Sequence, residues 1–204
     1  MSTQTVPVNV YAEMTPNPAT MKYVADRLLV PEGTVVEFTD PSEVKDAPLA
    51  AKLFNFPFVD SLFFAANFVT VTKNDLVEWE DVNLELRTFI REFIAAGHPT
   101  FTKVPEVIQR EDNSGKLTAP PTEVLPQNPI EERIVDVLEE YVRPAVEGDG
   151  GAIHFQSFNE GILTVVLRGA CSGCPSSMVT LKGGIEGLMQ RMVPEVKEVV
   201  AQEQ

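Results

Sequence analysis

Residues 162–192 read ILTVVLRGACSGCPSSMVTLKGGIEGLMQRM, and this stretch decides how the C-terminal part of the chain folds. The apolar run over residues 162–167 predicts a buried strand. Residues 175–192 predict a helix, because their apolar side chains recur at helical spacing on one face. Between the two lies a Cys-X-X-Cys motif made of Cys171 and Cys174. The stretch therefore predicts a strand, a loop with two thiols, and a helix.

The residues on either side complete an α-β-β-α-β order over residues 129–204. Asn128, Pro129 and Glu131 predict a helix start, with a side-chain acceptor at the N-cap, proline at the first position and an acid at the third. Alternation at residues 153–156 predicts the first strand, and residues 196–200 predict the last one. The predicted buried stripe of the first helix is Ile130, Ile134, Leu138 and Tyr141, with Val135 and Val142. We expect Gly183 and Gly184 to allow close packing of the second helix.

A proline-rich polar stretch separates this unit from the residues before it. Residues 99–128 interrupt the hydrophobic periodicity and read as a semi-extended linker, because proline removes backbone donors and disfavours helix in the preceding residue. The chain thus divides into residues 1–98, a linker over residues 99–128, and residues 129–204.

Residues 1–98 predict a second small module that contains no cysteine. Apolar patterns predict strands at 22–30 and 34–38, a short helix at 47–54, a hairpin across residues 65–67 and a long helix at 79–96 ended by Gly97. The predicted fold class is α+β, with two small α/β domains joined by a Pro-rich linker.

Composition restricts the function. Among the 204 residues are 16 basic and 30 acidic ones, which gives a formal net charge of −14. Such an excess of acid argues against binding to nucleic acid or to an anionic membrane surface, and it favours partners with basic faces. No apolar run is long enough to cross a bilayer, and the first residues lack the features of a signal or transit peptide. We therefore expect a cytoplasmic, reducing location.

The Cys-X-X-Cys motif is where we expect the chemistry. Backbone N–H groups and the positive end of a helix stabilise thiolates, and two intervening residues let both sulfurs meet one metal or cluster. Three functions remain open from the residues alone, besides cysteines that merely pack in the core: a thiol–disulfide oxidoreductase, a zinc site and an iron–sulfur site. Metal sites of either kind prefer four ligands, and this chain has two thiols. A two-fold dimer with facing motifs would supply four.

The sequence also resembles a known family. Residues 148–151 (GDGG), 169–177 (GACSGCPSS), 180–186 (TLKGGIE) and 193–196 (VPEV) closely resemble the C-terminal domain of NifU-like (Nfu) proteins. Residues 15–18 (TPNP), 21–22, 48–50, 61–64 (SLFF) and 68–73 (FVTVTK) are similar to the Nfu N-terminal domain. The resemblance extends over nearly all of the chain outside the linker.

This resemblance implies a scaffold or carrier rather than an enzyme. It implies that Cys171 and Cys174 bind a [4Fe–4S] cluster shared by two chains, with a [2Fe–2S] cluster as the alternative. It further implies a homodimer in the cluster-bound state, an upstream cluster donor, and apo iron–sulfur proteins as recipients. A thiol–disulfide oxidoreductase remains the alternative function, and no nucleophile–base pair in the sequence indicates another catalytic activity.

Two nearby features have simpler interpretations. Residues 147–151 (EGDGG) lack the ligand spacing of a calcium loop, so we expect a turn, one whose backbone faces the cluster. His154 lies on a predicted strand, and we expect it at the surface or in an interface rather than as a ligand.

Overall fold

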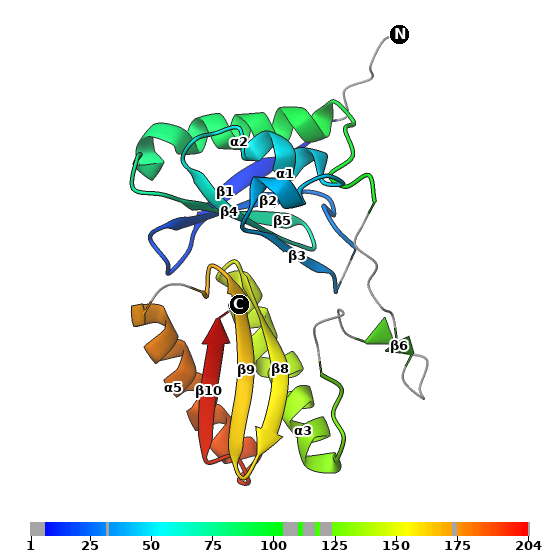
Figure 1. Cartoon of the computed structure of the whole chain (residues 1–204), viewed down its shortest axis with the longest axis vertical. Coiled ribbons are helices and arrows are strands. Elements are labelled where there is room, and N and C mark those ends of the chain that lie inside the picture. The colour runs from blue at the N-terminus through cyan, green and yellow to red at the C-terminus, as the bar shows by residue number, and fades with distance from the viewer. Residues whose placement is uncertain are drawn as a thin grey trace. The chain divides into compact units, whose positions relative to one another are not determined.

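The computed structural model describes residues 7–31, 33–103, 110–111, 117–118, 124–172 and 175–203. The chain forms two compact units, Met1–Pro121 and Thr122–Gln204, and the boundary between them falls inside the predicted linker. Each contains helices and a sheet, so the α+β class with two domains is confirmed (Figure 1). None of the described helices is long and apolar enough to span a bilayer.

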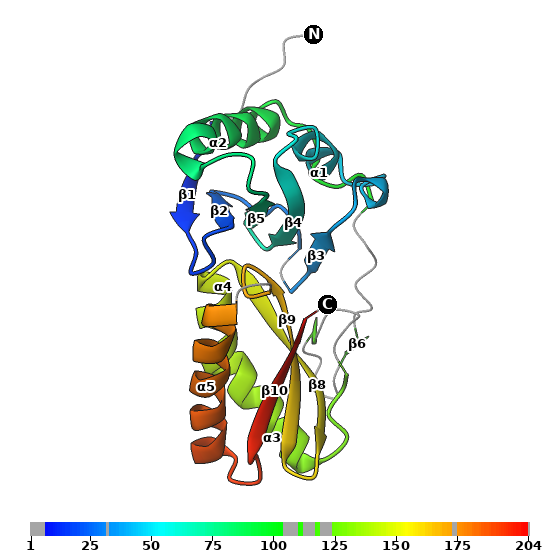
Figure 2. The same cartoon turned by 60° about the vertical axis from the view of Figure 1, so that its left-hand side comes forward.

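The first unit is a five-stranded antiparallel sheet in the order β1-β2-β5-β4-β3, with its helices on one face (Figure 2). Its elements are β1 (Val10–Met14), β2 (Thr20–Ala25), β3 (Val35–Phe38), a short 3-10 turn (Pro41–Glu43), α1 (Pro48–Leu53), β4 (Val59–Ala65), β5 (Phe68–Lys73) and α2 (Trp79–Ala95). The core between sheet and helices includes Leu49, Leu62, Val71, Leu86 and Ile90.

Most of the expected elements of this unit are present. The hairpin turns through Ala66, which takes a positive φ of 42°, and the long helix ends before Gly97, which has a φ of 76°. The strand expected at 22–30 is wrong at both ends, because β2 starts at Thr20 and stops at Ala25. β1 was not predicted from the sequence.

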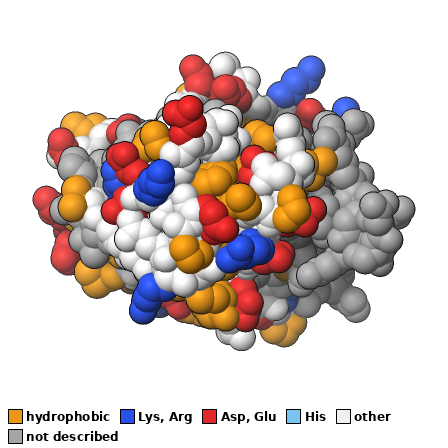
Figure 3. All heavy atoms as spheres, turned by 90° about the horizontal axis from the view of Figure 1, so that it is seen from below, with side chains coloured by type: hydrophobic (Ala, Val, Ile, Leu, Met, Phe, Trp, Pro, Cys, Tyr) orange, Lys and Arg blue, Asp and Glu red, His pale blue; other side chains and the backbone are white. Residues whose placement is uncertain are grey.

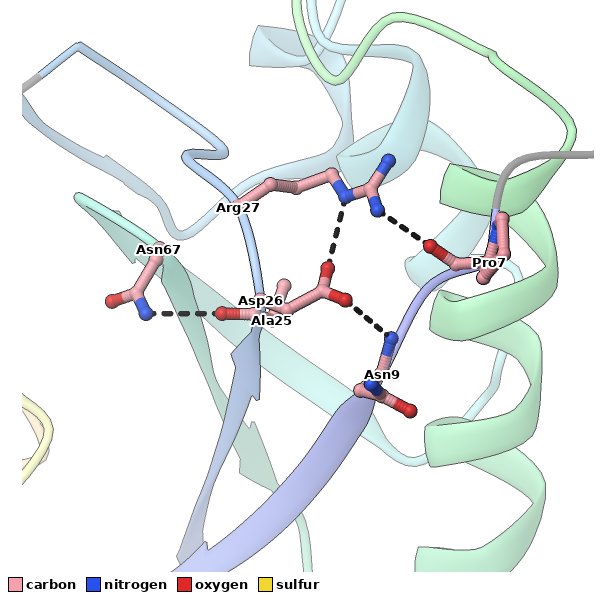
Figure 4. A network of polar contacts seen from close by, with 6 residues as sticks. All are labelled: Pro7, Asn9, Ala25, Asp26, Arg27 and Asn67. Atoms are coloured by element: carbon pink, nitrogen blue, oxygen red, sulfur yellow. Dashed lines mark hydrogen bonds and ion pairs between the residues drawn. The ribbon is translucent and has the colours of Figure 1, made fainter.

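A polar network fixes the end of β2 (Figure 4). The Asp26 carboxylate accepts hydrogen bonds from the backbone N–H of Asn9 and from Nε of Arg27, both at 3.0 Å. Arg27 also donates to the Pro7 carbonyl at 2.7 Å, and the Asn67 side chain donates to the Ala25 carbonyl at 3.0 Å. These contacts join the beginning of the chain to the hairpin turn and explain why the strand stops at Ala25.

The second unit has the predicted α-β-β-α-β order. Its elements are α3 (Pro129–Val137), a π-helical turn (Leu138–Val142), α4 (Arg143–Gly148), β8 (Gly151–Asn159), β9 (Ile162–Gly169), α5 (Pro175–Met192) and β10 (Glu198–Glu203). The central strand β9 pairs with β8 in antiparallel and with β10 in parallel orientation. β10 begins two residues later than the predicted strand at 196–200. Near the end of the first unit, β6 (Arg110–Glu111) pairs with β7 (Leu117–Thr118).

The start of α3 follows the predicted capping pattern. Asn128 Oδ1 accepts hydrogen bonds from the backbone N–H groups of Ile130 and Glu131 at 3.1 and 3.0 Å. The Glu131 carboxylate accepts a hydrogen bond in return from the backbone N–H of Gln127 at 2.7 Å. Two N–H groups that the helix start leaves unpaired are thereby satisfied, and so is the N–H of Gln127 just before the cap.

The predicted stripe of this first helix is only partly correct. Ile134, Leu138 and Val142 are buried, but Tyr141 is 48% exposed. The reason is the π-helical turn just before Pro144, which adds a residue to the turn and rotates Val142, instead of Tyr141, toward the core. Pro144 has no N–H to donate to the preceding turn, which favours this irregularity.

The core of the second unit lies between its sheet and its helices. Ile153, Phe155, Leu163, Val165 and Val199 of the strands meet helix residues such as Ile134, Val146, Ile185 and Met189. The expectation that Gly183 and Gly184 pack closely is wrong for this unit, because a Cβ at either position would meet no atom within 4 Å.

Candidate functional site

The structure places the cysteine motif at the predicted junction of strand and helix. β9 ends at Gly169, α5 begins at Pro175, and Cys171 lies in the loop between them. Cys174 lies outside the described residues, so its role as a ligand stays a prediction.

A tight turn carries Cys171 back toward the start of β8. Gly169 has a positive φ of 65°, which glycine adopts without strain. The Gly169 carbonyl accepts hydrogen bonds from the backbone N–H and the Oγ of Ser172, at 3.1 and 2.8 Å. The next residue, Ala170, donates its N–H to the Gly150 carbonyl at 3.2 Å. Cys171 is therefore held beside the residues that precede β8.

Those residues are the predicted turn at 147–151. α4 ends at Gly148, and Gly150 takes a positive φ of 83° and donates its N–H to the Glu147 carbonyl at 3.1 Å. Gly151 then begins β8 and pairs with Gly169 of β9. The expected turn is confirmed, and it lies beside the loop of Cys171, whereas the expectation that it faces a cluster stays a prediction.

Cys171 is buried in this arrangement. It is 7% exposed and belongs to the hydrophobic core of the second unit. A Cβ at Gly151 would lie 2.7 Å from the Cys171 Sγ, so the sulfur rests against the backbone of Gly151. Sequence reasoning did not identify Gly151 as a neighbour of the thiol, although the glycine pair at 150–151 was a visible signal.

Burial raises the pKa of the Cys171 thiol to about 12, and the negative charge of Asp149 adds to the effect. The expectation that this junction stabilises a thiolate is therefore wrong for Cys171 in the conformation described. Desolvation and a nearby carboxylate both disfavour the charged form, and here they outweigh the backbone N–H groups and the helix end. At neutral pH the buried group is a thiol.

Comparison with known proteins identifies the family. A family model described as "Scaffold protein Nfu/NifU N terminal" matches residues 10–97, and one described as "NifU-like domain" matches residues 134–200. The second match includes both Cys171 and Cys174. The chain belongs to the Nfu/NifU family of scaffold proteins.

Curated relatives agree with this assignment. The chain is 33% identical over 186 residues to a human protein named "NFU1 iron-sulfur cluster scaffold homolog, mitochondrial", covering 91% of this chain and 68% of that protein. It is 31% identical over 190 residues to the Drosophila willistoni protein of the same name, covering 91% of this chain. The chain spans only 60% of the length of that relative.

A solved structure is also similar to part of this Nfu chain. It is the solution structure of a NifU-like protein from Saccharomyces cerevisiae, with 24% identity and a TM-score of 0.42, covering 51% of this chain and 92% of that one.

Of the two histidines of the Nfu chain, one is buried and the other packs against an aromatic ring. His154 of β8 is buried, so the expectation of a surface position is wrong. The ring of His98 packs against Phe93 of α2, with 5.1 Å between the ring centroids. Among the residues that the structure describes, which leave out Cys174, no group of three or more His, Cys, Asp or Glu side chains could hold a metal ion.

The donor chemistry of this loop fits an iron–sulfur cluster, because thiolates are the ligands that such clusters take. The conformation of Cys171 does not yet present its sulfur, since a ligand has to be deprotonated and accessible. On the face shown in Figure 3, acidic, basic and apolar side chains are interspersed.

Proposed function

We propose that this protein is an iron–sulfur cluster scaffold and carrier, which takes up a cluster at Cys171 and Cys174 and passes it to apo-proteins. One observation carries the proposal: in a chain of the Nfu family, Cys171 lies in the strand-to-helix loop inside the match to the NifU-like domain. The printed names of the relatives, which are iron–sulfur cluster scaffold homologues, support the same cargo.

The cargo is held between two protomers in this proposal. An iron–sulfur cluster takes four protein ligands, and each chain has two cysteines. A two-fold axis through the cluster brings two motifs together and uses the same residues of both chains. Such a shared site opens when the protomers separate, which suits delivery rather than storage.

The cluster is proposed to be [4Fe–4S], with [2Fe–2S] as the alternative. Anaerobic reconstitution with iron and sulfide distinguishes the two, because a shared [4Fe–4S] cluster gives about two irons per chain and a shared [2Fe–2S] cluster about one. Cys171→Ala removes a ligand and should abolish iron uptake. Ser172→Ala is the matched control, because it changes the neighbouring residue and leaves both thiols. Absence of iron uptake by the unaltered protein would refute the proposal.

Delivery is proposed to proceed by exchange of ligands. Thiolates of an apo-protein replace those of the two protomers one at a time, and each released sulfur takes up a proton. For the upstream donor and for the recipients, we propose the class of protein and no individual partner. The net charge of −14 favours recipients with basic faces.

The first unit is proposed to hold a recipient or donor within reach of the second. A freely flexible chain of about 30 residues, the length of the predicted linker 99–128, would span on the order of 30 Å. The described part of this stretch is ordered in places, since the Phe101 ring packs against Phe64 and β6 pairs with β7. Deletion of residues 1–98 should leave iron binding by the second unit unchanged and slow the transfer to particular recipients. Equal transfer rates with and without these residues would contradict this role.

We propose a carrier role without catalysis. The alternative, thiol–disulfide exchange, requires a reactive thiolate, and the raised pKa of Cys171 disfavours one in the described conformation. Turnover of a disulfide substrate faster than by a free thiol would favour that alternative. We also propose a cytoplasmic location, which cell fractionation tests. The relatives above are named mitochondrial.

A further inference from the structure

The contact between Gly151 and Cys171 is closer than any other residue at position 151 would allow. A Cβ there would lie 2.7 Å from the Cys171 Sγ, 3.1 Å from its Cβ and 2.6 Å from the Arg168 carbonyl oxygen. Real Cβ atoms essentially never approach other heavy atoms within 3.0 Å. The sulfur therefore occupies the space that a side chain at position 151 would take. We call this placement the retracted position of Cys171.

The retracted position places the sulfur on the side of the hydrophobic core. Cys171 is 7% exposed and packs with the same core cluster as Ile153, Leu167 and Ile185. A cluster of four irons and four sulfides is far larger than a thiol, and a closely packed interior does not admit it. A sulfur in this position therefore cannot reach a cluster that two chains share.

The loop has a short segment that can carry Cys171 outward without breaking the strands. The last pair of β8 and β9 joins Gly151 to Gly169, so residues 170–172 lie beyond the ladder. Gly169 takes a positive φ of 65°, and the Ala170 N–H donates to the Gly150 carbonyl at 3.2 Å, which holds this segment beside the turn before β8. Movement of residues 170–172 leaves the pairing of β8 with β9 in place, and it has to break the contact with Gly150 and withdraw Cys171 from the core.

We propose that Gly151 is a positioning residue that holds Cys171 in the retracted position while no cluster is bound, and that cluster uptake requires residues 170–172 to swing out and release the thiol. The cluster step rests on the proposed function, whereas the retracted thiol rests on the contact between Gly151 and Cys171 and on the burial of Cys171. Uptake is then limited by how often the loop opens.

Labelling of a single thiol tests the proposal. Cys174→Ser leaves Cys171 as the only cysteine of the full chain. We expect a water-soluble disulfide reagent to react with Cys171 at least about tenfold more slowly in the native protein than in the urea-unfolded protein. The reason is that the reagent reaches a buried thiol only while the protein is locally open. At low urea this rate should hardly change, because a local opening exposes little surface.

Two results with this variant would overturn the proposal. Reaction as fast as in the unfolded chain would mean that Cys171 is not retracted. Reaction whose urea dependence matches that of global unfolding would mean that residues 170–172 do not open by themselves.

Replacement of Gly151 tests its role directly. Gly151→Ala in the Cys174→Ser background should accelerate labelling at least about tenfold, because the new Cβ displaces the sulfur. Gly148→Ala is the matched control in the same turn, since a Cβ there would meet no atom within 4 Å, and its labelling rate should stay unchanged. Labelling of the Gly151→Ala variant at the original rate would overturn the role of Gly151.

Gly151→Ala could also fold poorly, because the new Cβ meets the Arg168 carbonyl. A stability measurement tests the contact in that case. Cys171→Ala removes the sulfur, so Gly151→Ala should shift the urea midpoint less in that background than in the unaltered chain. Equal shifts in the two backgrounds would contradict the contact. None of these experiments needs iron, so failure of cluster reconstitution and failure of this proposal are separate results.

Discussion

The carboxylate of Asp26, which follows β2, accepts a hydrogen bond from the backbone N–H of Asn9, which precedes β1. The bond joins the two strands at the end of the hairpin that they form (Figure 4). Hydrogen bonds from the Arg27 side chain and from Asn9 lower the pKa of Asp26 below its ordinary value. A lowered pKa means that the ionised form stabilises the folded state at pH values above the ordinary carboxylate pKa.

Asp26→Asn should therefore lower the stability of the first unit at neutral pH. The difference from the unaltered protein should shrink as the pH falls through the lowered pKa of Asp26, because protonation removes the same charge. Urea midpoints measured from neutral pH down to about pH 3 check this. Asp60→Asn, at an exposed position of β4, is the control. A difference that is the same at both ends of the pH range would contradict the assignment.

Asn128→Ala should destabilise the second unit by about 1 kcal/mol, because the side chain accepts two hydrogen bonds from the first turn of α3. Urea unfolding followed by helix circular dichroism measures the loss. Gln127→Ala is a matched control, since Gln127 takes part in the cap through its backbone N–H. Equal effects of the two substitutions would show that the Asn128 cap contributes nothing.

Gly187→Ala should stabilise the second unit by up to about 1 kcal/mol, since alanine favours a helix interior over glycine. Gly187 lies at an exposed position of α5, and a Cβ there would meet no atom within 4 Å. Gly161→Ala should do the opposite, because Gly161 has a φ of +91° and a Cβ would lie 2.9 Å from the Lys197 side chain. Thermal unfolding of both variants measures the contrast, and a lowered midpoint for Gly187→Ala would refute it.

Local signals in the sequence predicted much of the fold. The cap at Asn128 and the helix end at Gly97 depend on residues within one turn, so a short window of sequence contains their cause. The orientation of Tyr141 was predicted incorrectly, because the π-helical turn before Pro144 changes the helical register. β1 escaped prediction because its five residues form an edge strand whose place depends on pairing with β2.

The candidate site, too, could be predicted only in part from local patterns in the sequence. The position of Cys171 between a strand and a helix was predictable from residues 162–192 alone. Its burial was not, because the sulfur rests against Gly151, twenty positions earlier in the chain, and the pairing of β8 with β9 brings the two together. The pKa of Cys171 follows from that burial, so it too was outside the reach of local patterns.

In the proposed function, two chains share one cluster through their cysteines. Native mass spectrometry of the anaerobically reconstituted protein tests it most directly, because it counts chains and cluster atoms in the same particle. We expect a species of two chains, each of 22.5 kDa, plus one cluster, and we expect this species to be absent from the Cys171→Ala variant. A single chain that carries a complete cluster, or a cluster-bearing dimer that persists in Cys171→Ala, would contradict it.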